Sequence, residues 1–86
     1  MKNYLWAVHH LELLNNNVVD DTTFLFTTFE AAQKFFVKTK KRGLHYSIDA
    51  DYEIKSNGDN YAYMENKDKG ALIEIRLGTI GVDKTL

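Results

Sequence analysis

Residues 27–43 read TTFEAAQKFFVKTKKRG and carry the strongest helical period in the chain. Thr27 and Glu30 stand three residues apart, the spacing of a capping box, in which a hydroxyl and a carboxylate satisfy free backbone amides at the helix start. Apolar residues then recur on one side and lysines on the other. Gly43 is typical of a helix C-terminus. We therefore expect one helix over about residues 28–42.

The segments on both sides of this helix have the period of two that indicates β-strands. Before it, the apolar-rich runs 4–14 and 18–27 are separated by Asn15-Asn16-Asn17, which favours a hairpin turn. After it, residues 45–54 and 71–77 alternate apolar and polar side chains, and a short strand is expected at 60–65. The order strand, strand, helix, strand, strand, strand predicts an α+β fold. Its four- to five-stranded, mainly antiparallel sheet would carry the helix on one face.

The composition indicates an ordinary folded domain. The 86 residues suffice for one hydrophobic core, and the composition of 44% apolar and 27% charged residues argues against a disordered chain. A net charge of -1 argues against a histone-like phosphate binder, and the lack of cysteine excludes disulfides and thiol catalysis. We expect a single domain over residues 1–86, with a loose tail at 78–86.

No segment has the roughly 20 apolar residues that a membrane helix needs. His9-His10 interrupts the N-terminal apolar run before it could serve as a signal peptide. These features predict a soluble, cytoplasmic protein that does not associate with membranes.

The histidines are the first candidates for metal ligands. On a strand His10 and Glu12 would share a face, while His9 would point away. Zinc needs a third ligand, and His45 is the one remaining histidine. Ordinary strand histidines explain the pattern better, so no metal and no other cofactor is expected. Phosphate loops, nucleophile elbows and metalloprotease helices are also absent from the sequence, which favours a protein that is not an enzyme.

The aromatic side chains exceed what so small a core can hide. The chain has five Tyr, five Phe and one Trp, and exposed tyrosines are frequent anchors of protein interfaces. The predicted strand 45–54 also places three carboxylates on one face, where they would simply face solvent. The functional alternatives are a divalent-cation site, an acid and base pair, or contact with a basic partner. We therefore predict a partner-binding surface made of Tyr46, Asp49, Asp51, Tyr52, Glu53, Tyr61 and Tyr63.

Five positive and no negative charges lie between residues 31 and 42. A solvated helix face accounts for most of them. Contact with phosphate or nucleic acid is the alternative interpretation, and it would use Lys34, Lys38, Lys41 and Arg42.

The segment from Tyr4 to Phe36 combines a first strand containing Val8-His9-His10, an Asn/Asp-rich turn, a second strand and the helix start Phe26-Thr27-Thr28-Phe29-Glu30-Ala31-Ala32. In this pattern it resembles small accessory proteins of strand-strand-helix-strand type encoded by bacteriophages and other mobile elements. The resemblance implies no catalytic residue. It implies a protein that interferes with a host defence or host enzyme by binding it.

Our leading hypothesis is accordingly a non-enzymatic protein that inhibits a host protein by steric contact, for example a defence nuclease, in the manner of anti-CRISPR or anti-restriction proteins. One alternative is an oligomer that sequesters a nucleotide-like ligand between its subunits. A second, less favoured alternative is a small nucleic-acid-binding protein that uses the basic helix end. Homo-oligomers such as dimers are compatible with the leading hypothesis.

Overall fold

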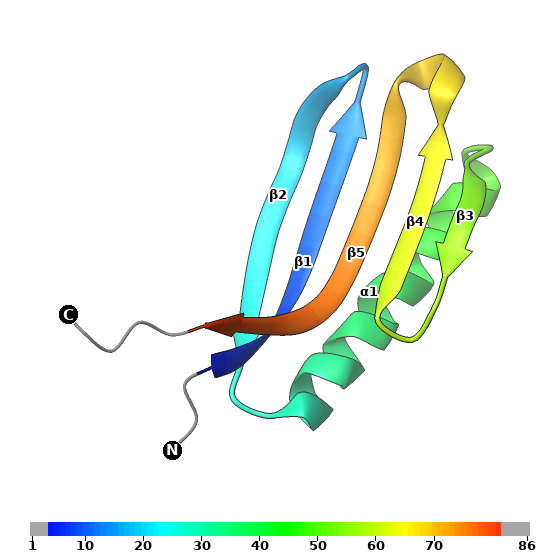
Figure 1. The fold of residues 1–86 in the computed structure, drawn as a ribbon. Coiled ribbons are helices and arrows are strands. Elements are labelled where there is room, and N and C mark those ends of the chain that lie inside the picture. The colour runs from blue at the N-terminus through cyan, green and yellow to red at the C-terminus, as the bar shows by residue number, and fades with distance from the viewer. Residues whose placement is uncertain (1–3, 82–86) are drawn as a thin grey trace.

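The computed structural model describes residues 4–81, which form one five-stranded sheet and one long helix (Figure 1). The strands are β1 (Tyr4–Leu14), β2 (Asn17–Phe26), β3 (Glu53–Asn57), β4 (Tyr61–Asn66) and β5 (Ala71–Gly81). The helix α1 (Phe29–Asp49) follows β2, and the short 3-10 helix η1 (Lys67–Lys69) precedes β5. The strand order is β2-β1-β5-β4-β3, with antiparallel pairing throughout. The predicted α+β fold is confirmed.

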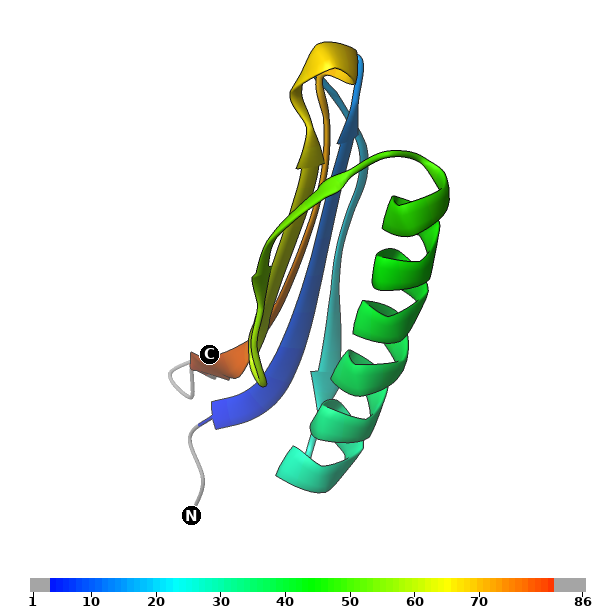
Figure 2. The same ribbon diagram turned by 90° about the vertical axis from the view of Figure 1, so that its right-hand side faces the viewer.

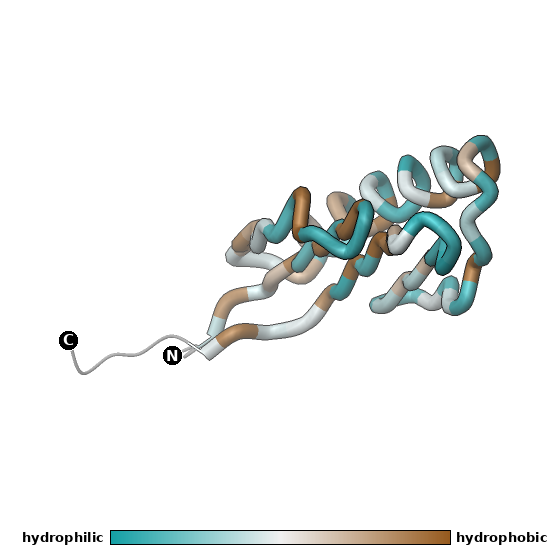
Figure 3. Tube along the Cα trace, turned by 90° about the horizontal axis from the view of Figure 1, so that it is seen from above, coloured by the Kyte–Doolittle hydropathy of each residue, from teal (hydrophilic) through white to brown (hydrophobic). Residues whose placement is uncertain are grey.

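The helix lies on one face of the sheet, and no other element of the described chain covers the opposite face (Figure 2). Viewed along the strands, the helix forms a second layer beside the sheet (Figure 3). Side chains between the two layers form the core. Its fully buried members include Val8, Phe36, Met64 and Ile75. We use "inner face" for the side of the sheet toward α1 and "outer face" for the opposite side.

The asparagine turn joins β1 to β2 as predicted. Asn15 and Asn16 both adopt the left-handed conformation, with φ of 53° and 64°, which asparagine tolerates better than most residues. Their backbone amides also bond to the η1–β5 loop, from Asn15 to Lys69 O at 3.1 Å and from Asn16 to Gly70 O at 2.9 Å. The turn therefore ties two loops together at this end of the sheet.

The helix begins one residue later than the capping-box prediction. Thr28, not Thr27, is the N-cap, and its hydroxyl accepts a hydrogen bond from the Ala31 amide at 3.2 Å. Thr27 and Glu30 therefore do not form the expected reciprocal pair, because Glu30 occupies the second helical position rather than the third.

The predicted helix end at residue 42 and the predicted strand over 45–54 are wrong. The helix continues through Gly43 to Asp49, and β3 starts only at Glu53. Gly43 is buried because α1 lies very close to the sheet there: a Cβ at this position would stand 3.1 Å from Met64 Cε and 3.4 Å from Ile75 Cδ1. The chain instead leaves the helix after Ala50, where Asp51 takes a left-handed φ of 62°.

The first part of the predicted loose tail belongs to a strand. β5 extends to Gly81, because Gly78 to Gly81 pair with the first residues of β1. The rest of that predicted tail, residues 82–86, lies outside the described residues. Within residues 4–81, α1 is too polar to be a membrane-spanning helix.

Candidate functional site

The outer face of the sheet has no covering element among the described residues (Figure 2). Strand register assigns side chains to it, because paired residues share a face and successive residues alternate. It carries Leu5, Ala7, His9, Leu11 and Leu13 from β1, Val18, Asp21, Thr23 and Leu25 from β2, Glu53 from β3, Tyr61, Tyr63 and Glu65 from β4, and Leu72, Glu74, Arg76 and Ile80 from β5.

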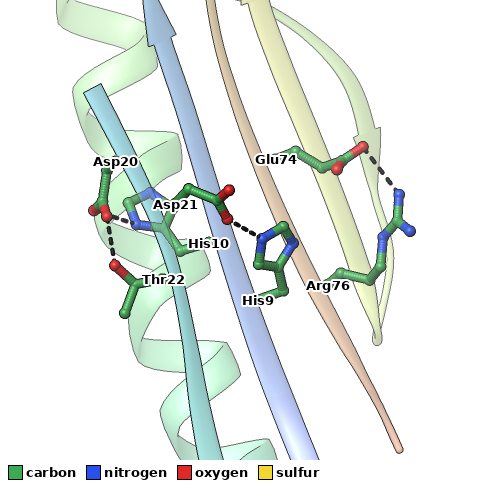
Figure 4. A network of polar contacts seen from close by, with 7 residues as sticks. All are labelled: His9, His10, Asp20, Asp21, Thr22, Glu74 and Arg76. Atoms are coloured by element: carbon green, nitrogen blue, oxygen red, sulfur yellow. Dashed lines mark hydrogen bonds and ion pairs between the residues drawn. The ribbon is translucent and has the colours of Figure 1, made fainter. Parts of the chain in front are cut away.

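The side chains in the middle of the outer face are polar, and they form hydrogen bonds and ion pairs with one another. His9 Nε2 lies 2.6 Å from Asp21 Oδ1, and Arg76 Nη2 lies 3.2 Å from Glu74 Oε2 (Figure 4). The Tyr61 hydroxyl donates to the same Glu74 oxygen at 2.7 Å. Farther along β4, the Tyr63 hydroxyl donates to Glu65 Oε2 at 2.9 Å. These contacts hold the polar side chains in defined positions on the open surface.

Two apolar patches flank this polar centre. One consists of Leu5, Ala7, Leu25 and Ile80, and the other of Leu11, Leu13 and Leu72. Leu25 is 54% exposed and Ile80 is 44% exposed, although both belong to regular strands. Contiguous apolar side chains around an ordered polar centre are typical of surfaces that bind another molecule.

The tyrosines of the outer face have perturbed ionisation. The hydrogen bond to Glu74 is the main reason that the pKa of Tyr61 lies above its ordinary value, since ionisation would bring two negative oxygens together. Partial burial raises the pKa of Tyr63, and its hydrogen bond to Glu65 adds to this effect. Both hydroxyls therefore remain donors across the neutral pH range.

The predicted tyrosine and acidic surface is not one surface. Glu53, Tyr61 and Tyr63 do belong to the outer face, where Glu53 pairs with Glu65 across β3 and β4. Tyr46 and Asp49 instead lie on α1, because the segment predicted as a strand is helical. Asp51 lies in the turn after the helix.

Tyr52 is buried, with 8% of its surface exposed. Its ring packs edge-on against that of Tyr46, with ring centroids 5.5 Å apart. Burial is also the main reason that the pKa of Tyr52 is raised. Tyr52 therefore serves the core instead of a partner-binding surface.

The basic residues of α1 separate into two groups. Lys34, Lys38 and Lys41 are exposed on the side of the helix opposite its buried residues, as the sequence predicts. Arg42 is exposed on another side and borders a cavity between the helix and the sheet. Lys40 is structural, because its ammonium donates to Gly58 O at 2.8 Å and lies over the Phe36 ring.

This inner cavity has a volume of about 450 Å³ and lies between α1 and strands β1, β2 and β5. It is lined by His10, Glu12, Asp20, Phe24, Phe35, Thr39, Arg42, Gly43, Tyr46 and Ile73. The sequence predicts that His10 and Glu12 share a face and that His9 points away, and the register confirms both. The proximity of Asp20 to His10 was missed, because it depends on the register between β1 and β2.

Asp20 is the best-connected polar group of the cavity. Its Oδ2 lies 3.0 Å from His10 Nδ1, and its Oδ1 accepts a hydrogen bond from Thr22 Oγ1 at 2.6 Å (Figure 4). The bond from Thr22 is the largest influence on the pKa of Asp20, which is lowered; burial opposes the shift and His10 reinforces it. Among residues 4–81, no three His, Asp or Glu side chains are grouped so that they could hold a metal ion.

Comparison with known proteins gives no relative from which a role could be transferred. No family model, no curated protein and no solved structure matches the chain. The chemistry of the outer face and of the inner cavity is therefore the basis for proposing a function.

Proposed function

We propose that the chain is a non-enzymatic binding protein that recognises another protein through the outer face of its sheet. The observation that carries this proposal is the pair of apolar patches around an ordered polar centre, on a face that no described element covers. Side chains already held by intramolecular bonds lose little conformational freedom when a partner binds. Tyr61 and Tyr63 supply the aromatic anchors that the sequence suggested.

The charge of the face defines the chemistry of the partner. Four carboxylates belong to it, those of Asp21, Glu53, Glu65 and Glu74. Two cations compensate them, Arg76 beside Glu74 and Lys55 between Glu53 and Glu65. The partner surface is therefore apolar at two places and basic opposite the carboxylates, since a basic surface complements their excess charge.

The proposed mode of action, steric blocking of a host protein, is suggested by the resemblance to phage-encoded accessory proteins. Such a protein needs no catalytic group, since binding over a functional surface of a host protein blocks it sterically. A host enzyme that handles nucleic acid, for example a defence nuclease, commonly has the basic surface that this face would complement.

A matched set of variants tests the proposal. Leu25→Asp/Ile80→Asp places two charges in one outer patch, at positions exposed enough to tolerate them. Ile48→Asp makes the same chemical change on α1, where Ile48 is 70% exposed. The immobilised protein should capture from bacterial lysate a partner that is lost with the double variant and retained with Ile48→Asp.

The proposal fails if every captured protein binds the double variant as well as the original chain. It also fails if light scattering shows that the isolated chain forms a dimer which Leu25→Asp/Ile80→Asp dissociates. In that case a second copy, and not another protein, would occupy the outer face. Circular dichroism of each variant separates these outcomes from loss of folding.

A further inference from the structure

The side chains on the inner face of the sheet are apolar on the β4–β5 side and polar on the β1–β2 side. Toward β4 and β5 it is apolar, and Met64, Ile73 and Ile75 pack against the helix. Toward β1 and β2 it carries four polar side chains on this same face, namely His10, Glu12, Asp20 and Thr22. A helix that only covered a core would face apolar residues at these positions.

The packing of α1 also differs between these two sides of the sheet. Gly43 allows α1 to lie against Met64 and Ile75, which holds the helix close to the β4–β5 side. The cavity remains on the other side of the same helix, where Phe35, Thr39, Arg42 and Tyr46 recur at helical spacing. Its volume of about 450 Å³ is within the range of about 300–1,000 Å³ that is common for small-molecule sites.

Two polar groups of the cavity have unused bonding capacity. Asp20 is already engaged by Thr22 and His10. Glu12, however, has only a loose contact with His10, at 3.9 Å. The buried hydroxyl oxygen of Thr39 has no hydrogen-bond partner among the described residues. Buried polar atoms are nearly always bonded, so the Thr39 hydroxyl points to a ligand that bonds to it. The Glu12 side chain is 29% exposed, and its carboxylate is open to a donor from the same ligand.

The remaining walls define the shape and charge of that ligand. The Phe24 and Phe35 rings lie 4.6 Å apart, and Tyr46 adds a third aromatic side chain. Flat aromatic molecules pack well against such rings. Arg42 is exposed at the rim and makes no ion pair within residues 4–81, so its guanidinium is free to bind an anionic group.

We propose that this inner cavity binds a purine mononucleotide, with guanine as the preferred base. The base would lie against the aromatic walls, and adjacent N–H donors on the guanine edge would bond to the Glu12 carboxylate. The phosphate would bind to Arg42 at the rim. The site lies within one chain, unlike the intersubunit site considered from the sequence, and it is independent of the outer face.

Calorimetric titration and thermal unfolding of the full chain with GMP, AMP, guanosine and inorganic phosphate test this proposal. We expect saturable binding of GMP with a rise in Tm, because a ligand that binds only the folded state stabilises it. Guanosine should bind about tenfold more weakly, since it lacks the charged contact with Arg42. AMP should also bind more weakly, and phosphate alone should not raise Tm.

Isosteric variants separate the two polar contacts. Glu12→Gln should weaken GMP binding about tenfold and change AMP binding little. Arg42→Gln should weaken GMP binding by a similar factor and leave guanosine binding unchanged. Lys34→Gln, on the solvent side of α1, and Leu25→Asp/Ile80→Asp, on the outer face, are controls that should bind GMP normally.

The proposal is overturned if millimolar GMP neither binds nor raises Tm. It is also overturned if phosphate alone binds as tightly as GMP, which would indicate anion contact only, or if a folded Glu12→Gln variant binds GMP unchanged. Arg42 is exposed, so Arg42→Gln keeps the test decisive even if Glu12→Gln does not fold.

Discussion

His10 and Asp20 contact each other diagonally across β1 and β2, with His10 Nδ1 3.0 Å from Asp20 Oδ2 on the inner face of the sheet. The neighbouring residue of each strand repeats the pair on the outer face, where His9 and Asp21 are 2.6 Å apart. Successive strand residues point to opposite faces of the sheet. The dipeptides His9-His10 and Asp20-Asp21 therefore form one polar contact on each face. The inner pair borders the cavity, and the outer pair borders the apolar patches.

The stability of the chain should decrease in acid partly through Asp20. Its pKa is lowered in the folded state, so its stabilising contribution is present above the unfolded pKa of about 3.9 and is lost as pH falls through the lower folded value. Asp20→Asn should remove this part of the pH dependence. The loss should stay below about 1 kcal/mol at neutral pH, because the side chain is 40% exposed.

Urea unfolding of the original chain and of Asp20→Asn, measured from neutral pH into acid, checks this prediction. The two free energies of unfolding should converge as the pH falls. A constant difference at every pH would show that the charge of Asp20 does not contribute.

Gly43 should resist replacement by larger residues. Alanine improves helix propensity by about 1 kcal/mol, but its Cβ would be 3.1 Å from the flexible end of Met64, so Gly43→Ala should be close to neutral. Gly43→Val should destabilise the fold by about 1–3 kcal/mol, because further atoms would press the helix away from β4 and β5. Gly78→Ala, where no atom lies within 4 Å of the added Cβ, is the steric control.

Denaturant unfolding measures these differences. If Gly43→Val were as stable as Gly43→Ala, the close approach of α1 to the sheet would be contradicted.

Phe36 should be the most sensitive aromatic residue of the helix. It is fully buried, so Phe36→Ala should cost about 3–5 kcal/mol of unfolding free energy. Phe29 is 38% exposed and packs on Trp6 near the helix start, so Phe29→Ala should cost about 1 kcal/mol. Equal losses in chemical denaturation would contradict the packing of the core.

Tyr61 should ionise at unusually high pH because its hydroxyl donates to Glu74. Its pKa is raised in the folded state, so the associated stability is present below the unfolded pKa of about 10 and is lost as pH rises through the folded value. Glu74→Gln should return the pKa of Tyr61 toward its ordinary value, because it removes the negative charge beside the hydroxyl.

An alkaline titration of tyrosinate absorbance compares the two proteins, with Tyr61→Phe identifying the contribution of Tyr61. Glu30→Gln, a carboxylate change in the first turn of α1, should leave the curve unchanged. A Glu74→Gln curve identical to that of the original chain would refute the assigned hydrogen bond.

Local patterns in the sequence predicted most of the fold. The alternation over 71–77 marks β5, and the three asparagines mark a hairpin, because each depends only on neighbouring residues. The prediction of a strand over residues 45–54 is wrong because two patterns overlap there. Apolar and polar residues alternate, but Gly43 and Ser47 are also spaced as buried positions of a helix. The role of Gly43 depends on its contact with β4 and β5, which no local pattern reveals.

The candidate sites were less predictable than the fold. Glu53, Tyr61 and Tyr63 were assigned to a binding surface and do share the outer face, whereas Tyr46 and Tyr52 pack against each other elsewhere. The apolar patches and the inner cavity depend on which strands pair and in what register. The periodicity of a single segment does not reveal which other strand it pairs with or in what register.

The central claim, that the outer face binds a partner protein, is tested most directly by methyl NMR with a soluble paramagnetic agent. In the free chain the agent should broaden the methyl signals of Leu25 and Ile80 strongly and those of buried Ile75 weakly. Addition of the captured partner should protect Leu25 and Ile80 and leave exposed Val37 and Ile48 of α1 accessible. Protection of the α1 methyls, with the outer face still broadened by the agent, would contradict the account.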